Sequence, residues 1–112
     1  MLLQKRRIER KEFPRILSLG RRYTSPNLLA YILHDGEGVS KFSFSVSKKV
    51  CPKAVDRNKQ RRRGYSIIGH HVHNVGPGYA CFISFKKGSG KITHKKLEGE
   101  ILGLLGSANV IS

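Results

Sequence analysis

The apolar residues of the chain fall into short segments that have either helical or strand periodicity. Near the start, Phe13, Ile16 and Leu17 recur at helical spacing, with a proline where a first turn accepts it and Gly20 where a helix can end. This pattern predicts a short amphipathic helix over residues 12–19.

Strand-like patterns follow this helix. The mostly apolar run at residues 28–33 precedes Asp-Gly-Glu-Gly at residues 35–38, which is turn chemistry, so we expect a hairpin with the next strand. In that next strand Phe42, Phe44 and Val46 alternate with serines. The small serine face leaves depth for a ligand, although a solvent-exposed sheet face would show the same pattern.

The second half of the chain predicts a helix, a strand and a helix. Residues from Pro52 to about His73 have helical character that Gly64 and Gly69 should interrupt, and residues 79–85 form an apolar strand pattern between glycines. The last helix has an apolar stripe of Leu97, Ile101, Leu104 and Leu105. The expected order is α-β-β-α-β-α, with a further strand possible near the hairpin, and 112 residues suit one α+β domain.

The charge of the chain points to a polyanionic partner. Twenty-two Lys and Arg against seven Asp and Glu give a formal charge of +15, which nucleic acid would neutralise. No apolar run approaches the roughly 20 residues of a membrane-spanning helix, and the apolar start is too short for a signal peptide. We therefore expect a cytoplasmic protein without a membrane partner, whose residues 1–11 form a basic arm that is weakly ordered without its partner.

The basic charge is densest between residues 48 and 63, where eight basic residues accompany one acid. On a helix, Asn58, Arg62 and Tyr65 lie at i, i+4 and i+7, flanked by Arg57 and Arg61. Guanidinium groups bind phosphate bidentately, and tyrosine can stack on an unpaired base. The alternative is a solvated basic face without a specific partner, which usually contains interspersed acids.

The sequence offers no catalytic or metal-binding constellation. Glu98 and Glu100 would lie about 200° apart on a helix, and nothing selects a Ser-His-Asp triad. Cys51 and Cys81 lack the partner spacing of a zinc site with the histidines of residues 70–73, so we expect ordinary reduced thiols and no bound metal.

Two linked segments resemble a known family. Phe-Ser-Val-Ser-Lys-Lys-Val at residues 44–50, followed by Lys-Ala-Val-x-Arg-Asn-Lys-x-Arg-Arg at residues 53–62, resembles the signature block of the bacterial ribonuclease P protein. The resemblance extends to the first helix at residues 12–20, to Tyr31 in the next strand, and to residues 80–87.

The resemblance implies a fold and a function. The fold would be a central mixed sheet with a left-handed βαβ crossover, ribosomal-protein-S5-domain-2-like, although such connections are usually right-handed. The function would be that of the protein subunit of an endoribonuclease that removes the 5′ leader of precursor tRNA. The active site would lie on the ribonuclease P RNA, which would chiefly bind the Mg²⁺, with one protein per RNA.

The resemblance also implies two sets of site residues. A cleft between the first helix and the sheet would bind the leader. The expected RNA-binding residues are Lys48, Lys49, Lys53, Arg57, Asn58, Lys59, Arg61, Arg62 and Arg63. The expected leader-binding residues are Phe13, Leu17, Tyr31, Ser45 and Tyr65.

The chain departs from the family pattern at three positions. Gly64 and Tyr65 stand where the family usually has an apolar residue and an arginine, which suggests a bent helix or stacking in place of an RNA contact. Leu17 replaces a second aromatic residue, which should weaken leader stacking. A ribosomal or other structural RNA-binding protein is the alternative function, whereas a DNA-binding recognition helix is disfavoured by Gly64 and Gly69.

Overall fold

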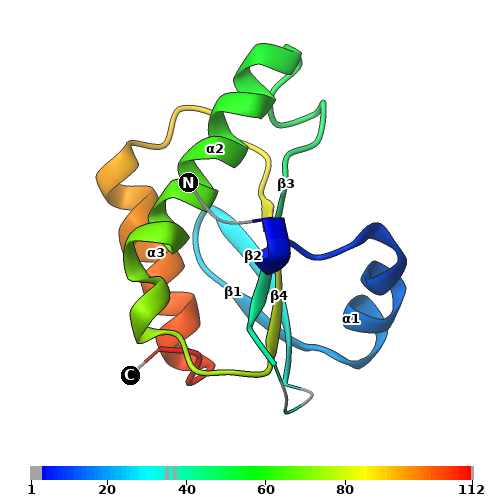
Figure 1. Ribbon diagram of the computed structural model, residues 1–112. Helices are drawn as coiled ribbons and strands as arrows, with labels where there is room; N and C mark the ends of the chain where they lie inside the picture. The colour runs from blue at the N-terminus through cyan, green and yellow to red at the C-terminus, as the bar shows by residue number, and fades with distance from the viewer. Residues whose placement is uncertain (1–3, 35, 37, 112) are drawn as a thin grey trace.

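The computed structural model describes residues 4–34, 36 and 38–111 (Figure 1). Its elements in chain order are η1 (Gln4–Arg6), η2 (Arg10–Glu12), α1 (Phe13–Leu19), β1 (Arg21–Thr24), β2 (Leu28–His34), β3 (Lys41–Ser45), α2 (Ala54–His71), η3 (Val72–Asn74), β4 (Tyr79–Phe85) and α3 (His94–Ser107). The expected α+β order is thus confirmed, and β1 is the further strand that the sequence left open.

The four strands form one mixed sheet in the order β1-β2-β4-β3. Strand β2 is antiparallel to both β1 and β4, whereas β3 is parallel to β4. The predicted hairpin between residues 28–33 and the following strand is therefore wrong, because β4 lies between them. Gly36 and Gly38 do have the positive φ of turn residues, but a turn fixes where the chain bends and not which strand it pairs with. The crossover expected to be left-handed runs from β3 through α2 to β4.

The helices cover the two faces of the sheet unequally. Helices α2 and α3 lie together on one face, and the short α1 lies on the other (Figure 1). Alternation along each strand sends one set of apolar side chains toward α2 and α3. The core on that face consists mainly of Leu28, Ala30, Ile32, Phe42, Phe44, Ile67, Ile68, Cys81, Ile83, Phe85, Leu97, Ile101, Leu104 and Leu105.

Helix α2 is continuous through both of its glycines, so the predicted interruption is wrong. Its buried positions Gln60, Gly64, Ile67 and Ile68 share one face at helical spacing. A Cβ at Gly64 would lie 2.7–2.8 Å from three ring carbons of Phe44, closer than atoms can pack. The missing side chain therefore serves close packing of α2 on β3, and does not break the helix.

The N-terminal segment lies against the outer edge of β3 from Gln4 onward, while residues 1–3 of the expected arm are outside the described residues. Arg7 forms a parallel β-bridge with Phe42, and the Ile8 amide donates to the Phe42 carbonyl at 3.1 Å. The Ile8 side chain is buried. The weak order expected of the arm without its partner stays a prediction.

Candidate nucleic-acid interface

One exposed stripe of α2 gathers the amide, guanidinium and aromatic groups that the sequence placed at helical spacing. Asn58, Arg61, Arg62 and Tyr65 line one shallow depression together with Val55, whose side chain is 74% exposed. Arg61 donates to the Asn58 side-chain oxygen. Among the described residues, neither Arg61 nor Arg62 forms an ion pair with a carboxylate. The stripe therefore presents uncompensated positive charge to solvent.

Arg57 and Arg63, both expected to bind RNA, are engaged within the protein. Arg57 donates to the carbonyls of Cys51 and Pro52 at 3.0 and 2.7 Å, so it supports the turn that leads into α2. Arg63 donates to the Gln60 side-chain oxygen and to the Ile92 carbonyl, both at 2.8 Å. Burial lowers the pKa of the Arg63 guanidinium.

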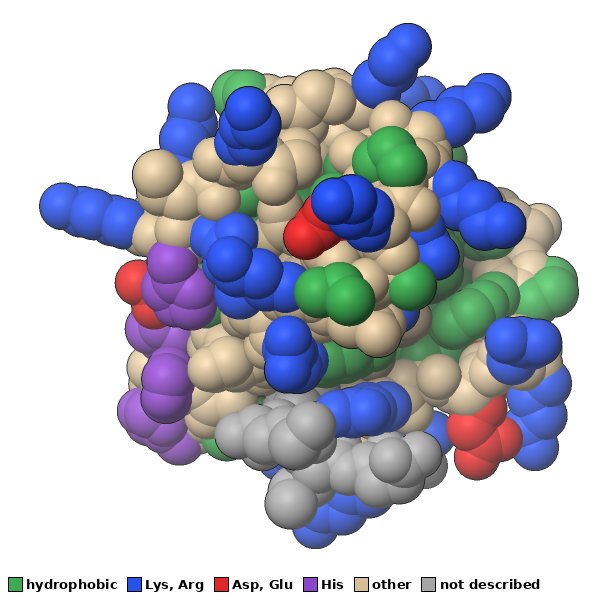
Figure 2. Space-filling view, turned by 90° about the horizontal axis from the view of Figure 1, so that it is seen from above, with side chains coloured by type: hydrophobic (Ala, Val, Ile, Leu, Met, Phe, Trp, Pro, Cys, Tyr) green, Lys and Arg blue, Asp and Glu red, His purple; other side chains and the backbone are tan. Residues whose placement is uncertain are grey.

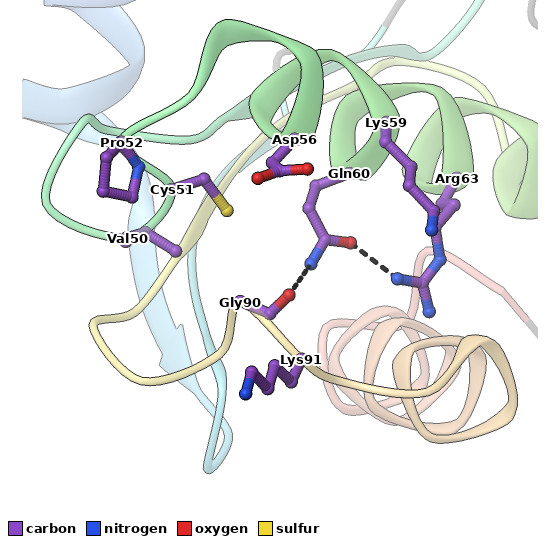
Figure 3. A pocket seen from close by; sticks show the side chains of 9 residues that line it. All are labelled: Val50, Cys51, Pro52, Asp56, Lys59, Gln60, Arg63, Gly90 and Lys91. Atoms are coloured by element: carbon purple, nitrogen blue, oxygen red, sulfur yellow. Dashed lines mark hydrogen bonds between the residues drawn. The ribbon is translucent and has the colours of Figure 1, made fainter.

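Arg63 belongs to a second pocket, between the start of α2 and the loop that precedes α3 (Figure 3). Buried Gln60 donates to the Gly90 carbonyl at 3.0 Å, so the helix and the loop are joined. Lys59 and Asp56, the acid of the basic segment, also line this pocket. Lys59 and Arg63 thus line this pocket, whereas Arg61 and Arg62 belong to the open stripe.

The remaining lysines of the predicted set lie in the turn before α2 and are exposed. Lys48 and Lys49 follow β3, and Lys53 occupies the N-cap position of α2. Figure 2 looks down on this end of the molecule and shows Lys and Arg side chains across the visible face, with few acidic side chains among them. Such a face attracts a polyanion over many contacts.

The other face of the sheet carries an aromatic group beside α1. The rings of Phe13 and Phe82 meet edge to face, with centroids 4.9 Å apart. Tyr31 stands directly opposite Phe82 in the β2–β4 register, and Arg22 stands opposite Tyr31 on β1. Side chains of directly paired residues lie on the same face, so these groups form one row across the sheet. Buried Ser43 continues the row on β3.

The expected leader-binding residues are only partly brought together. Leu17 is 45% exposed on α1, and half-buried Ser45 lies on the aromatic side of the sheet, opposite Ser84. Tyr65 lies elsewhere, in the depression of the α2 stripe. Phe82 is not among the residues expected from the sequence, although the alternation of the strand at residues 79–85 assigns it to this face.

Arg7 also belongs to the surface of the α2 stripe, although the sequence predicts that residues 1–11 form a weakly ordered arm. Its guanidinium carbon lies 4.5 Å from the centroid of the Tyr65 ring, and Arg7 lines the same depression as Asn58 and Arg62. No periodicity could have shown this contact, since it joins segments far apart in sequence.

Several titratable side chains lie outside these surfaces. Within the described part of the chain, no three His, Cys, Asp or Glu side chains could hold a metal ion together. Cys51 and Cys81 are free and buried, and burial raises the pKa of the Cys81 thiol far above its ordinary value, which keeps that thiol unreactive. His71 and Glu98 lie 3.1 Å apart and link α2 to α3.

Across the described ranges, the helices are all too short or too polar to cross a membrane.

Three kinds of comparison agree on the kinship of the chain. The family model described as Ribonuclease P matches residues 2–109. The ribonuclease P protein component of Microcystis aeruginosa is 30% identical over 106 residues, covering 91% of this chain and 88% of the relative. That of Synechocystis is 32% identical over 74 residues, covering 65% and 60%.

Solved structures of low sequence identity share the fold. A Staphylococcus aureus RNase P protein mutant with defective mRNA degradation activity superposes with a TM-score of 0.87 at 21% identity, covering 96% of this chain and 92% of that one. The Thermotoga maritima RNase P protein gives a TM-score of 0.82 at 20% identity, covering 90% and 96%. Because the family model matches residues 2–109, the chain belongs to the ribonuclease P protein family.

Proposed function

We propose that this chain binds ribonuclease P RNA through the exposed stripe of α2 and holds the 5′ leader of precursor tRNA on the aromatic row beside α1. The family forms the protein subunit of an endoribonuclease ribonucleoprotein that processes tRNA, with catalysis by the RNA. The proposal assigns the two surfaces of this chain to the two RNAs of that reaction.

The observation that carries the first assignment is the uncompensated charge of the α2 stripe. Arg61 and Arg62 form no ion pair with a carboxylate of the described residues, and they flank the same depression as Asn58. Burial in an RNA groove would supply phosphate oxygens to these guanidinium groups, which bind such oxygens in pairs. A structural RNA-binding protein would use the same chemistry, but the family membership favours the ribonuclease P RNA as partner.

The aromatic row suits the leader because that segment is single-stranded. Unpaired bases stack on aromatic side chains with little dependence on sequence, and each stacked base contributes about 1–3 kcal/mol. Phe13, Tyr31 and Phe82 supply aromatic side chains on one face, and exposed Arg22 adds a charge for the backbone.

The Mg²⁺ of the reaction belongs, in this proposal, chiefly to the RNA partner. The described residues bring no three metal-binding side chains together, whereas the phosphate groups of RNA supply hard oxygen ligands. When bound, the ion would polarise the phosphate and activate a water. One protein per RNA, in the cytoplasm where tRNA precursors are made, completes the proposal.

Salt dependence tests the α2 assignment. Each phosphate neutralised by the protein makes log K fall by about 0.7 to 0.9 for a tenfold rise in salt. We expect the double variant Arg61→Gln, Arg62→Gln to weaken binding of ribonuclease P RNA and to flatten the slope accordingly. Lys95→Gln with Lys96→Gln on α3 is the charge-matched control, since both lysines are exposed. Equal slopes for the two double variants would refute the assignment.

A further inference from the structure

The N-terminal segment brings a guanidinium group to the α2 stripe from another part of the chain. The Cζ of Arg7 lies 4.5 Å from the centroid of the Tyr65 ring, within the range of a cation–π interaction. Arg7 lines the depression that holds Asn58 and Arg62, and also the adjoining one that holds Ser66. Arg7 and Arg62 therefore face the same space from two elements.

The backbone at Arg7 is fixed on both sides. The Ile8 amide donates to the Phe42 carbonyl at 3.1 Å, and the Ile8 side chain is buried. Arg6 donates to the Ser40 carbonyl at 3.4 Å. These contacts hold the segment along β3, so that the side chain of Arg7 reaches α2 from a defined starting point.

Tyr65 is held by its own contacts. Its hydroxyl accepts a hydrogen bond from the Phe44 amide at 3.4 Å, and its ring meets the Phe44 ring edge to face at 5.2 Å. The Tyr65 hydroxyl is thus directed to the backbone of β3, and the Arg7 guanidinium lies over one face of the ring. Tyr65 therefore orients this guanidinium group. A base could stack on that ring face only after displacing Arg7.

The hydrogen-bonding capacity of Arg7 is not used up within the protein. Its Nε atom is buried and has no hydrogen-bond partner in the described part of the chain. Arg57 and Arg63 differ, because both donate to backbone carbonyls. Arg7 and Arg62 bring two guanidinium groups to one space, and an anion between them would offset their mutual repulsion.

We propose that Arg7 binds a phosphodiester group of the ribonuclease P RNA together with Arg62, and that Tyr65 is the positioning residue that orients Arg7. This inference rests on the proposed function of the α2 stripe. It extends the RNA-binding surface to a second element and gives Tyr65 a role distinct from stacking on the leader.

The first test is Arg7→Gln, measured as the affinity for ribonuclease P RNA over a range of salt concentrations. Loss of one charge-assisted contact should weaken binding about tenfold. The salt slope should fall by about 0.7 to 0.9, the value for one phosphate. Arg10→Gln is the matched control, since Arg10 is an exposed arginine of the same segment that lines neither depression. Arg7→Lys should keep the slope near that of the wild type.

The second test separates positioning from stacking by combining Arg7→Gln with Tyr65→Leu. Tyr65→Leu alone should weaken RNA binding and reduce the slope, although its side chain carries no charge. If Tyr65 acts through Arg7, the double variant should bind RNA about as well as Arg7→Gln alone, because both substitutions remove the same contact with RNA. Circular dichroism of each variant checks that the fold is retained.

Three results would separately refute the role of Arg7, the role of Tyr65 and the proposed function of the α2 stripe. Equal slopes for Arg7→Gln and Arg10→Gln would remove Arg7 from the RNA-binding surface, even where Arg61 and Arg62 prove to belong to it. Additive losses in the double variant would mean that Tyr65 contacts RNA itself. Wild-type binding by the Arg61, Arg62 double variant would instead refute the proposed function on which this inference rests.

Discussion

Replacing Gly64 by alanine should destabilise the protein, although alanine is the better helix former. The added Cβ would lie 2.7–2.8 Å from three carbons of the Phe44 ring, in a buried part of α2. Overpacking of this kind costs about 1–3 kcal/mol, and three simultaneous close contacts favour the upper end. The helix propensity of alanine returns about 1 kcal/mol. We therefore expect a net loss of about 2 kcal/mol.

Urea denaturation followed by circular dichroism measures this loss as a lower midpoint at unchanged m-value. The melting temperature should fall by about 8 °C, at about 4 °C per kcal/mol for a domain near this size. Gly99→Ala on α3 is the matched control, because no other side chain or distant backbone atom lies within 4 Å of the position that a Cβ would take there. That variant should gain up to about 1 kcal/mol.

If the loss comes from a clash with the Phe44 ring, a smaller side chain at position 44 should reduce it. Phe44→Leu shortens the side chain that Gly64 accommodates, so Gly64→Ala should cost less in that background than in the wild type. Stability of Gly64→Ala equal to or above that of the wild type would refute the argument. It would show that α2 can move away from β3 without loss.

Other expectations follow from the two surfaces and from Glu100, which accepts hydrogen bonds from the turn before β2. Protein free of RNA should not cleave precursor tRNA in Mg²⁺, and addition of ribonuclease P RNA should start cleavage; robust cleavage by the protein alone would contradict this. Tyr31→Ala and Phe13→Leu should weaken the assembled enzyme's affinity for precursor but hardly for mature tRNA, whereas equal losses for both would assign these residues to the core. Burial alone would raise the pKa of Glu100, but hydrogen bonds from Ser25 and Asn27 and the nearby Lys96 charge hold it below its ordinary value. A carboxyl group whose pKa is lowered by folding stabilises the folded protein at pH values above its unfolded-state pKa of about 4.3. Glu100→Gln should therefore lower the melting temperature at neutral pH. The difference from the wild type should vanish as the pH falls through the folded-state pKa of Glu100. A difference that persists in acid would contradict the ionic origin of the effect.

Local patterns predicted the elements of this fold better than their pairing. Helices and strands with clear periodicity were found where expected, including α3 with its stripe of buried leucines. Strand β1 has the sequence Arg-Arg-Tyr-Thr, which is too short and too polar to be predicted as a strand. It forms because it pairs with the edge of β2. The position of β4 between β2 and β3 depends on contacts far apart in sequence, which turn residues do not encode.

The same limit explains what was missed in the candidate site. The helical spacing of Asn58, Arg62 and Tyr65 correctly predicted that they share a surface. The spacing could not show that Arg63, which directly follows Arg62, is directed toward the Ile92 carbonyl. Nor could it place Arg7 over Tyr65, because that contact requires the segment before α1 to run beside β3.

The path of the N-terminal segment also bears on aggregation. An edge strand exposes unpaired amides and carbonyls, to which a strand of another molecule can add. At one edge of this sheet β1 is short and carries Arg21 and Arg22, whose charges oppose such addition. At the other edge, Ile8 occupies the Phe42 carbonyl that an intruding strand would use. The segment that carries Arg7 therefore leaves fewer free backbone groups at this edge with which a strand of another copy could pair.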